Sequence, residues 1–192
     1  MKGENIYLSI IERVDCTLRV YLLRLLLIFT QFASTSVQSN RSVVSRFALY
    51  KLLKLMGEPS DHNYCFSHSG KLSAILVASS TDKIVIDIER SDRKLSKPLK
   101  EKIRKLYGNT SVSELGIIMI FECLIKLSVI PSPFSLGNQA YGHSGVKIVS
   151  IDGNIFEVTL KNVKVFSRFY KFNNLLVCIT RDRNQLPISL NV

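Results

Sequence analysis

The chain lacks the features that mark membrane and secreted proteins. Its most apolar N-terminal stretch, residues 20–29, is far shorter than the roughly 20 residues needed to span a bilayer, and Arg24 interrupts it. The stretch therefore predicts a core helix or strand. The N-terminal region also lacks the small-residue cleavage pattern of a signal peptide, although Phe32-Ala33-Ser34 leaves secretion open.

Cysteine is sparse, and its spacing excludes the common metal and disulfide patterns. The four cysteines are scattered along the chain: Cys16, Cys65, Cys123 and Cys178. No Cys-x-x-Cys pair occurs, so we expect buried reduced thiols and no zinc site or disulfide framework. The sequence therefore predicts a cytoplasmic protein without a membrane span.

Acidic residues are also scarce. The chain has 26 Lys and Arg against 15 Asp and Glu, a formal net charge of +11. Such a balance predicts a polyanionic partner, either a phosphate-rich cofactor, an acidic protein or a nucleic acid. No arginine-glycine tract or aromatic-basic RNA signature is present, so nucleic acid is the least favoured of the three.

The chain is long enough for one or two compact domains, because 192 residues with 46% hydrophobic content can bury a sizeable core. After a polar loop at 31–40, Asn40 predicts the cap of a helix over about 42–56. Buried or alternating apolar runs predict strands at 72–78, 146–151, 155–160, 163–170 and 175–180, with a turn at 79–82.

Basic residues dominate the stretch 90–105, which holds eight of them against two acids. Ser96 and Pro98 predict the start of a helix there. The resulting surface is either an ordinary solvated face or a docking surface for an acidic partner, whose complementary charge would raise the association rate.

Two carboxylates share one face of a predicted strand at 83–89. Because successive side chains of a strand alternate between its faces, Asp87 and Glu89 should project side by side, with isoleucines on the other face. Two carboxylates in one small area repel each other unless a cation, a proton or a basic side chain lies between them, so the pair is a candidate hard-metal site. The alternative is that both face water on an edge strand.

A third carboxylate lies in an apolar helix predicted over 111–130. Ser111 and Glu114 have capping-box spacing, and Pro131 would stop the helix. Glu122 and Lys126 are the only charges beyond its first turn, and their i,i+4 spacing places them on one face. They are either functional residues or a surface ion pair that contributes a few tenths of a kcal/mol.

Three short blocks resemble those of a known family. Phe-Ser-His-Ser-Gly at 66–70, Ile-Asp-Ile-Glu at 86–89 and Phe-Glu-Cys-Leu-Ile-Lys at 121–126 resemble, in order, the blocks of the 4′-phosphopantetheinyl transferases of the surfactin-synthetase-activating type. The resemblance extends loosely from about Arg41 to the C-terminus. It implies an α+β fold of two similar halves, 1–81 and 82–192, with the active site in the cleft between them, which a monomer would complete.

The resemblance also implies an activity and its residues. Such enzymes transfer the phosphopantetheine arm of coenzyme A to a serine of an acidic acyl or peptidyl carrier protein and release 3′,5′-ADP. By position, Asp87, Glu89 and Glu122 would hold Mg²⁺, and Glu122 with Lys126 would be catalytic. The coenzyme A contacts would come from the following residues: Arg41, Ser42, Ser67, His68, Lys71 and Lys126. His62 and His143 lack such a context and are expected at the surface.

The chain departs from the family pattern at several positions. Glu58 and Phe121 stand where the family has lysine, Ile118 where it has tryptophan and Cys123 where it has alanine. The lost lysines affect phosphate binding more than metal binding, so we expect Mg²⁺ binding to survive, with either weaker coenzyme A affinity or an altered pose of the cofactor. An alternative function follows, that of a degenerate relative that binds a carrier protein without turnover.

Overall fold

The computed structural model describes residues 6–12, 46, 49, 63–70, 72–78, 83–130 and 145–182. Several sequence predictions lie outside these residues: the core segment at 20–29, the loop at 31–40, the turn at 79–82, Cys16, Arg41, Ser42, Glu58, His62, Lys71 and His143. Of the helix predicted over 42–56, Arg46 and Leu49 are described, and both are helical. The fold is α+β, and the chain divides into a first compact unit, Met1–Thr81 with Pro187–Val192, and a second, Asp82–Leu186.

The first unit contains a three-stranded antiparallel sheet. Its strands are β1 (Ile6–Glu12), β2 (Asn63–Ser69) and β3 (Leu72–Ala78), in the order β1-β3-β2. The predicted buried strand at 72–78 is confirmed, since β3 lies at the centre of the sheet and its residues from Ala74 to Val77 are fully buried. Gly70, with φ of +57°, forms the turn between β2 and β3, a conformation that favours glycine.

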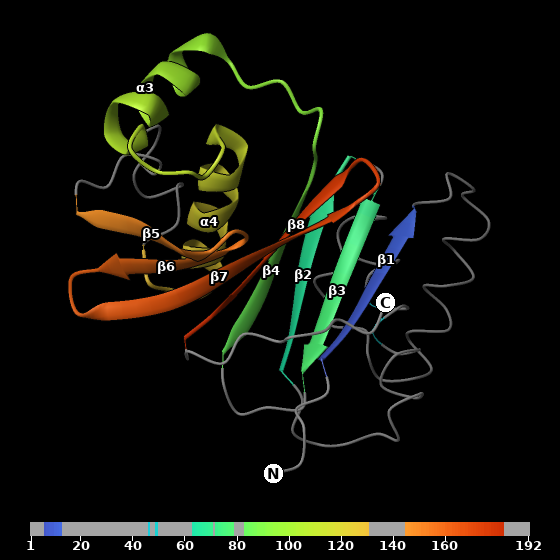
Figure 1. The fold of residues 1–192 in the computed structure, drawn as a ribbon. Helices are drawn as coiled ribbons and strands as arrows, with labels where there is room; N and C mark the ends of the chain where they lie inside the picture. The colour runs from blue at the N-terminus through green and yellow to red at the C-terminus, as the bar shows by residue number, and fades with distance from the viewer. Residues whose placement is uncertain are drawn as a thin grey trace. The chain divides into compact units, whose positions relative to one another are not determined.

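The second unit contains a five-stranded antiparallel sheet in the order β4-β8-β7-β6-β5 (Figure 1). Its strands are β4 (Ile84–Arg90), β5 (Val146–Asp152), β6 (Ile155–Leu160), β7 (Val163–Phe172) and β8 (Leu175–Arg181). The strands predicted in the C-terminal part are confirmed and form a meander, and the predicted strand at 83–89 is confirmed as β4, which pairs with β8.

Two helices follow β4, namely α3 (Lys97–Tyr107) and α4 (Glu114–Lys126). The start predicted at Ser96 and Pro98 is confirmed, because Ser96 is the N-cap of α3. Helix α4 is apolar almost all round and lies against the sheet, where it contacts β4 and β8 (Figure 1). An apolar surface of this kind is buried because its transfer out of water is favourable.

Both ends of α4 differ from the prediction. The prediction of a capping box formed by Ser111 and Glu114 is wrong, because the N-cap is Ser113. The Oγ of Ser113 accepts a hydrogen bond of 3.1 Å from the N–H of Gly116. Glu114 is then the first helical residue. The helix also ends before Pro131: Leu127 is its C-cap, and Ser128 adopts the left-handed region with φ of 61°, which helical backbone cannot continue.

No helix within the described ranges is long and apolar enough to cross a membrane.

Candidate functional site

Strand β4 carries Asp87 and Glu89 on the face that α4 covers. Asp87 lies opposite Cys178 of β8, and the thiol of Cys123 on α4 reaches the same position, donating to the carbonyl oxygen of Cys178 at 3.8 Å. Although β4 is the edge strand of the described sheet, Asp87 is buried. The alternative of two water-facing carboxylates is therefore wrong for Asp87.

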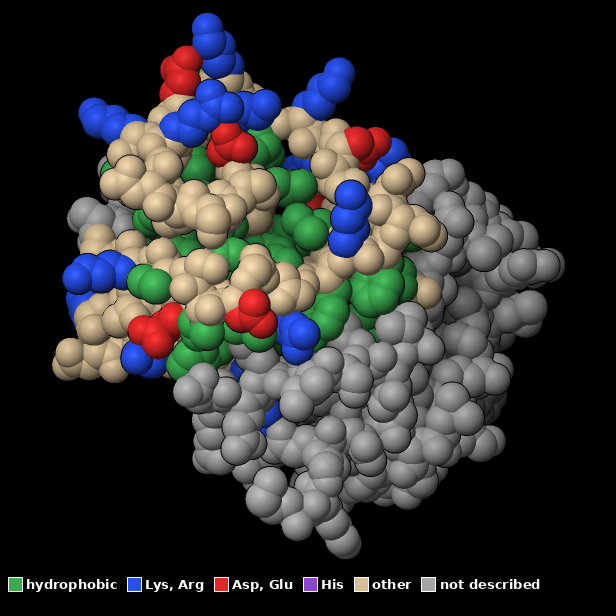
Figure 2. All heavy atoms as spheres, in the orientation of Figure 1, with side chains coloured by type: hydrophobic (Ala, Val, Ile, Leu, Met, Phe, Trp, Pro, Cys, Tyr) green, Lys and Arg blue, Asp and Glu red, His purple; other side chains and the backbone are tan. Residues whose placement is uncertain are grey.

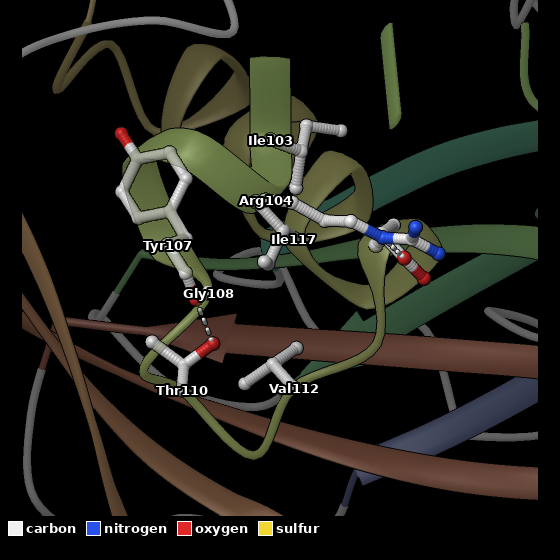
Figure 3. Close-up of a pocket in the computed structure, with 8 residues that line it drawn as sticks. Ile103, Arg104, Tyr107, Gly108, Thr110, Val112 and Ile117 are labelled. Atoms are coloured by element: carbon white, nitrogen blue, oxygen red, sulfur yellow. Dashed lines mark hydrogen bonds and ion pairs between the residues drawn. The ribbon is translucent and has the colours of Figure 1, made fainter. Parts of the chain in front are cut away.

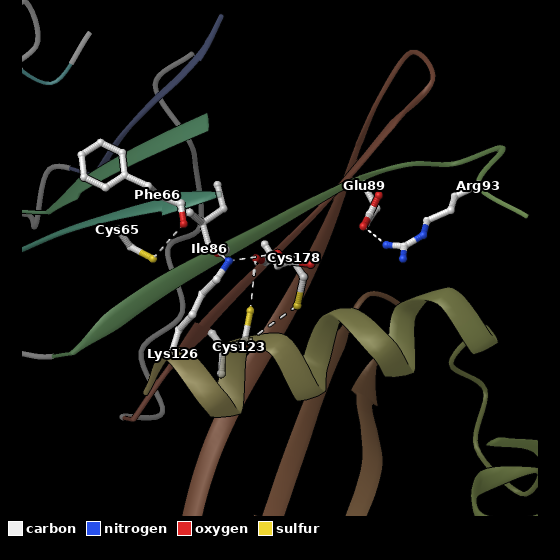
Figure 4. A network of polar contacts seen from close by, with 10 residues as sticks. Cys65, Phe66, Ile86, Glu89, Arg93, Cys123, Lys126 and Cys178 are labelled. Carbon is white, nitrogen blue, oxygen red and sulfur yellow. Dashed lines mark hydrogen bonds and ion pairs between the residues drawn. The ribbon is translucent and has the colours of Figure 1, made fainter. Parts of the chain in front are cut away.

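Lys126, in the last turn of α4, crosses to β4. Its Nζ donates to Oδ1 of Asp87 at 2.9 Å. It also donates to the carbonyl oxygen of Ile86 at 2.7 Å (Figure 4). The structure thus joins the second and third sequence blocks through one ammonium group. The ion pair shown for Lys126 links a helix to a strand and is not the helix-surface pair considered from the sequence.

Glu89 has a different cation, the guanidinium of Arg93. The two side chains form an ion pair at the end of β4 (Figure 4). Arg93 lies in the turn that follows the strand, where its N–H bonds to the carbonyl oxygen of Arg90 at 3.0 Å. The N–H of Ser91 bonds to the carbonyl oxygen of Asn174 at 2.8 Å, which ties this turn to the β7–β8 hairpin. Arg93 is not among the site residues predicted from the sequence.

Glu122 occupies α4 one turn before Lys126 and is partly exposed. Among the residues that the structure describes, no group of three or more His, Cys, Asp and Glu side chains is arranged to hold a metal ion. Asp87 and Glu89 instead each bind a positively charged side chain of the protein. The arrangement therefore provides carboxylates that attract cations, with Lys126 and Arg93 as their counter-ions.

The surroundings of Asp87 include buried thiols. Cys123 and Cys178 are fully buried and free, as expected for reduced cysteines. Burial raises the pKa of the Cys123 thiol well above its ordinary value, and the neighbouring Cys178 raises it further. The Cys123 thiol is therefore neutral, and both thiols are close-packed neighbours of Asp87.

Two departures from the family pattern are core positions of α4. Phe121 is fully buried and packs against Tyr107 of α3, with ring centroids 5.6 Å apart and planes tilted by 60°. Ile118 is also buried. A lysine in place of Phe121 would have to bury its charge, so this position contributes to packing between α3 and α4 and not to a phosphate site.

The block around His68 belongs to the first unit, on β2. Nδ1 of His68 forms a hydrogen bond of 2.9 Å with Oγ of Ser73, its cross-strand partner on β3. Ser73 and Ser67 are buried, whereas His68 is partly exposed. The sheet thus holds the imidazole through one ring nitrogen.

A pocket of about 420 Å³ opens between the end of α3 and the start of α4 (Figure 3). Ile103, Tyr107 and Ile117 contribute its apolar lining, and Arg104 and Glu114 form an ion pair of 2.6 Å beside it. Burial raises the pKa of Tyr107 to about 12, so its hydroxyl stays protonated at neutral pH. None of the residues selected by the family resemblance lines this pocket.

The predicted basic surface forms around α3. Its exposed or partly exposed members are Arg90, Arg93, Lys94, Lys97, Lys100, Lys102, Arg104 and Lys105. Figure 2 shows Lys and Arg side chains over the region where Figure 1 draws α3, with fewer carboxylates among them. Asp92 pairs with Arg90 at 2.7 Å, and Glu114 with Arg104, which leaves the surface with a positive excess.

The chain matches no known family model and no curated protein sequence.

Proposed function

We propose that the protein is a divergent 4′-phosphopantetheinyl transferase, which moves the phosphopantetheine arm of coenzyme A to a serine of an acyl or peptidyl carrier protein. The observation that carries the proposal is the contact of Lys126 with Asp87, because it brings together two of the three blocks that resemble the family. The α+β fold agrees with the fold class of that family. The pseudo-dimeric arrangement of two similar halves is part of the same proposal.

The residue types fit magnesium. Carboxylate oxygens are hard donors, and Mg²⁺ is commonly bound by one or two carboxylates together with substrate phosphates. Asp87, Glu89 and Glu122 would hold the ion, and the two carboxylates of β4 already attract cations in the structure. When bound, Mg²⁺ would neutralise charge on the pyrophosphate of coenzyme A.

The protein's own residues would then perform the transfer. Glu122 would accept the hydroxyl proton of the carrier serine while the serine oxygen attacks the β-phosphate, and 3′,5′-ADP would leave. Lys126 and His68 would stabilise negative charge on the phosphates, and the hydrogen bond with Ser73 would hold the imidazole of His68 in place. Arg41, Ser42, Ser67 and Lys71 complete the proposed coenzyme A contacts.

The partner would be an acidic carrier protein, as in nonribosomal peptide or polyketide biosynthesis. The basic surface around α3 follows directly on β4, so complementary charge would guide the carrier toward Asp87. We place the enzyme in the cytoplasm and expect it to act as a monomer.

One observation favours the second candidate, a relative that binds a carrier without turnover. Phe121 occupies a family lysine position and is fully buried, so this chain has one phosphate-binding cation fewer at α4. In that case the basic surface would still bind a carrier, and transfer would fail.

Mass spectrometry of an apo-carrier protein incubated with the protein, Mg²⁺ and coenzyme A tests the proposal. We expect the mass of one phosphopantetheine arm to be added by the wild type and not by Glu122→Gln, whose side chain keeps its size but cannot take a proton. Glu101→Gln on the exposed face of α3 is the matched control and should retain transfer. Carrier binding without mass gain across several carriers would support the second candidate instead.

A further inference from the structure

The two carboxylates of β4 are already neutralised by the protein. Asp87 holds Lys126 of α4, and Glu89 holds Arg93 of the following turn. Asp87 and Glu89 lie two residues apart on one strand face, so their α-carbons are about 6.6 Å apart. Two acids and two bases thus lie together at the proposed metal site, where Glu122 would add a third carboxylate.

We propose that Arg93 and Lys126 are exchangeable counter-ions: they leave the carboxylates when a divalent cation binds there, and they then bind the phosphates of the ligand. The inference rests on the proposed function and adds Arg93 to the phosphate-binding residues. It also extends the role of Lys126, which would occupy one place before the ligand binds and another afterwards.

Charge and solvation favour such an exchange. A divalent cation competes with a single ammonium or guanidinium group for the same oxygens, and the displaced group then needs a new anion. The phosphates of a nucleotide supply that anion. Each displaced cation therefore has an anionic partner before and after ligand binding.

Arg93 is well placed to make the exchange. Its side chain is 45% exposed, so it can swing to a new partner without breaking the core. The turn that carries it is held by backbone hydrogen bonds of Ser91 and Arg93, so its Cα stays in place while the side chain moves. A guanidinium presents a planar fork that matches two phosphate oxygens.

The exchange would also compensate for a substitution seen in the sequence. The family lysine next to Glu122 is the buried Phe121 in this chain. Arg93 provides a partly exposed positive charge in the turn after β4. The phosphate-binding function of the missing lysine would thus be taken over by a residue outside the three family blocks.

Metal and nucleotide binding to Arg93→Gln test the proposal without any activity measurement. Binding of Mn²⁺, which prefers the same oxygen ligands as Mg²⁺, is measured by electron paramagnetic resonance of the free ion. We expect Arg93→Gln to bind Mn²⁺ about two- to fivefold more tightly, the factor that corresponds to an exposed ion pair. With Mn²⁺ saturating, calorimetry should show 3′,5′-ADP binding about tenfold more weakly, because a charged hydrogen bond is lost.

Two control variants separate the exchange from general charge effects. Lys94→Gln removes the same charge from the next residue, and both affinities should stay within twofold of the wild type. Arg93→Lys keeps the positive charge but lacks the planar guanidinium group. Its Mn²⁺ affinity should match that of the wild type, and its 3′,5′-ADP affinity should lie between those of Arg93→Gln and the wild type.

The opposite changes in the two affinities are the signature of the exchange. Unchanged or weaker Mn²⁺ binding by Arg93→Gln, no Mn²⁺ binding by the wild type, or equal effects of Lys94→Gln would each overturn the proposal. If the wild type modifies a carrier but Arg93→Gln shows no such opposite changes, the exchange fails and the transferase stands. If the opposite changes appear without carrier modification, the exchange stands and the transferase fails.

Discussion

Helix α4 carries one ion pair at each end, and the two pairs differ in their surroundings. At its C-terminal end Lys126 binds Asp87 at 2.9 Å, with side chains that are 26% and 10% exposed. At its N-terminal end Glu114 binds Arg104 at 2.6 Å, with side chains that are 30% and 66% exposed. The shorter pair is therefore the one in water.

Burial, and not length, should decide how much each ion pair contributes to the free energy of unfolding. Water screens the Arg104–Glu114 attraction and solvates either group if the other is removed. Asp87 has little water to replace Lys126, so loss of the ammonium would leave a buried carboxylate without that cation. The C-terminal pair should hold α4 to the sheet, and the N-terminal pair should matter little.

The largest effect is expected from Lys126→Met, which keeps the length of the side chain and removes its charge. We expect the free energy of unfolding to fall by about 2–4 kcal/mol, less than for a fully buried pair because Lys126 is partly exposed. Urea unfolding followed by circular dichroism measures it. Lys105→Met on the exposed face of α3 is the control, and equal midpoints for the two variants would contradict the ranking. Adding Asp87→Asn should recover part of the loss.

An intermediate effect is expected from the cap of α4. Ser113→Ala removes the acceptor of the Gly116 N–H and should lower the free energy of unfolding by about 1 kcal/mol. Ser111→Ala is the matched control, because Ser111 has capping-box spacing to Glu114 but is not the cap. Urea unfolding of both variants decides between the two serines: a larger loss for Ser111→Ala would restore the capping box.

The smallest effect is expected from Arg104→Gln, at about 0.2–1 kcal/mol, and salt should reduce it further. The hydrogen bond from Arg104 lowers the pKa of Glu114 below its ordinary value. The stabilisation is therefore complete above the unfolded-state pKa of Glu114 and is lost as the pH falls through its folded-state pKa. Urea unfolding at neutral and acidic pH should show the difference from wild type shrinking in acid. Lys97→Gln is the control, and a difference that grows in acid would contradict this origin.

Much of the fold follows from local sequence pattern. The alternation of isoleucines with Val85, Asp87 and Glu89 predicts β4, and the apolar run at 72–78 predicts β3. The C-terminal strands are separated by turn residues such as Gly153 and Asn173, both with positive φ. These signals are local, so they predict the strands without any knowledge of the tertiary contacts.

The ends of α4 show where local signals become ambiguous. Ser111 and Ser113 are both acceptable caps by residue type, and the spacing to Glu114 favours the wrong one. Pro131 is a strong stop signal, but the left-handed Ser128 ends the helical path earlier. A serine carries no sequence signal for that backbone conformation.

Asp87, Glu89 and Lys126 could be selected from the sequence, but neither their pairing nor Arg93 could. Asp87 and Lys126 are 39 residues apart, and only the packing of α4 on the sheet brings them together. Glu89 and Arg93 are four residues apart, a spacing that suggests a partner in a helix, but here the pair spans the end of a strand and a turn. The four-residue spacing was the available signal for this ion pair, but outside a helix such a spacing does not predict that two side chains meet.

The two thiols beside Asp87 have a consequence for the motion of this part of the molecule. Cys123 and Cys178 come from the helix and from the sheet, and neither is exposed while these elements are packed together. A thiol that is buried and has a raised pKa reacts with electrophiles only after it reaches water and ionises. The rate at which these cysteines are alkylated therefore reports how often the interface between helix and sheet opens.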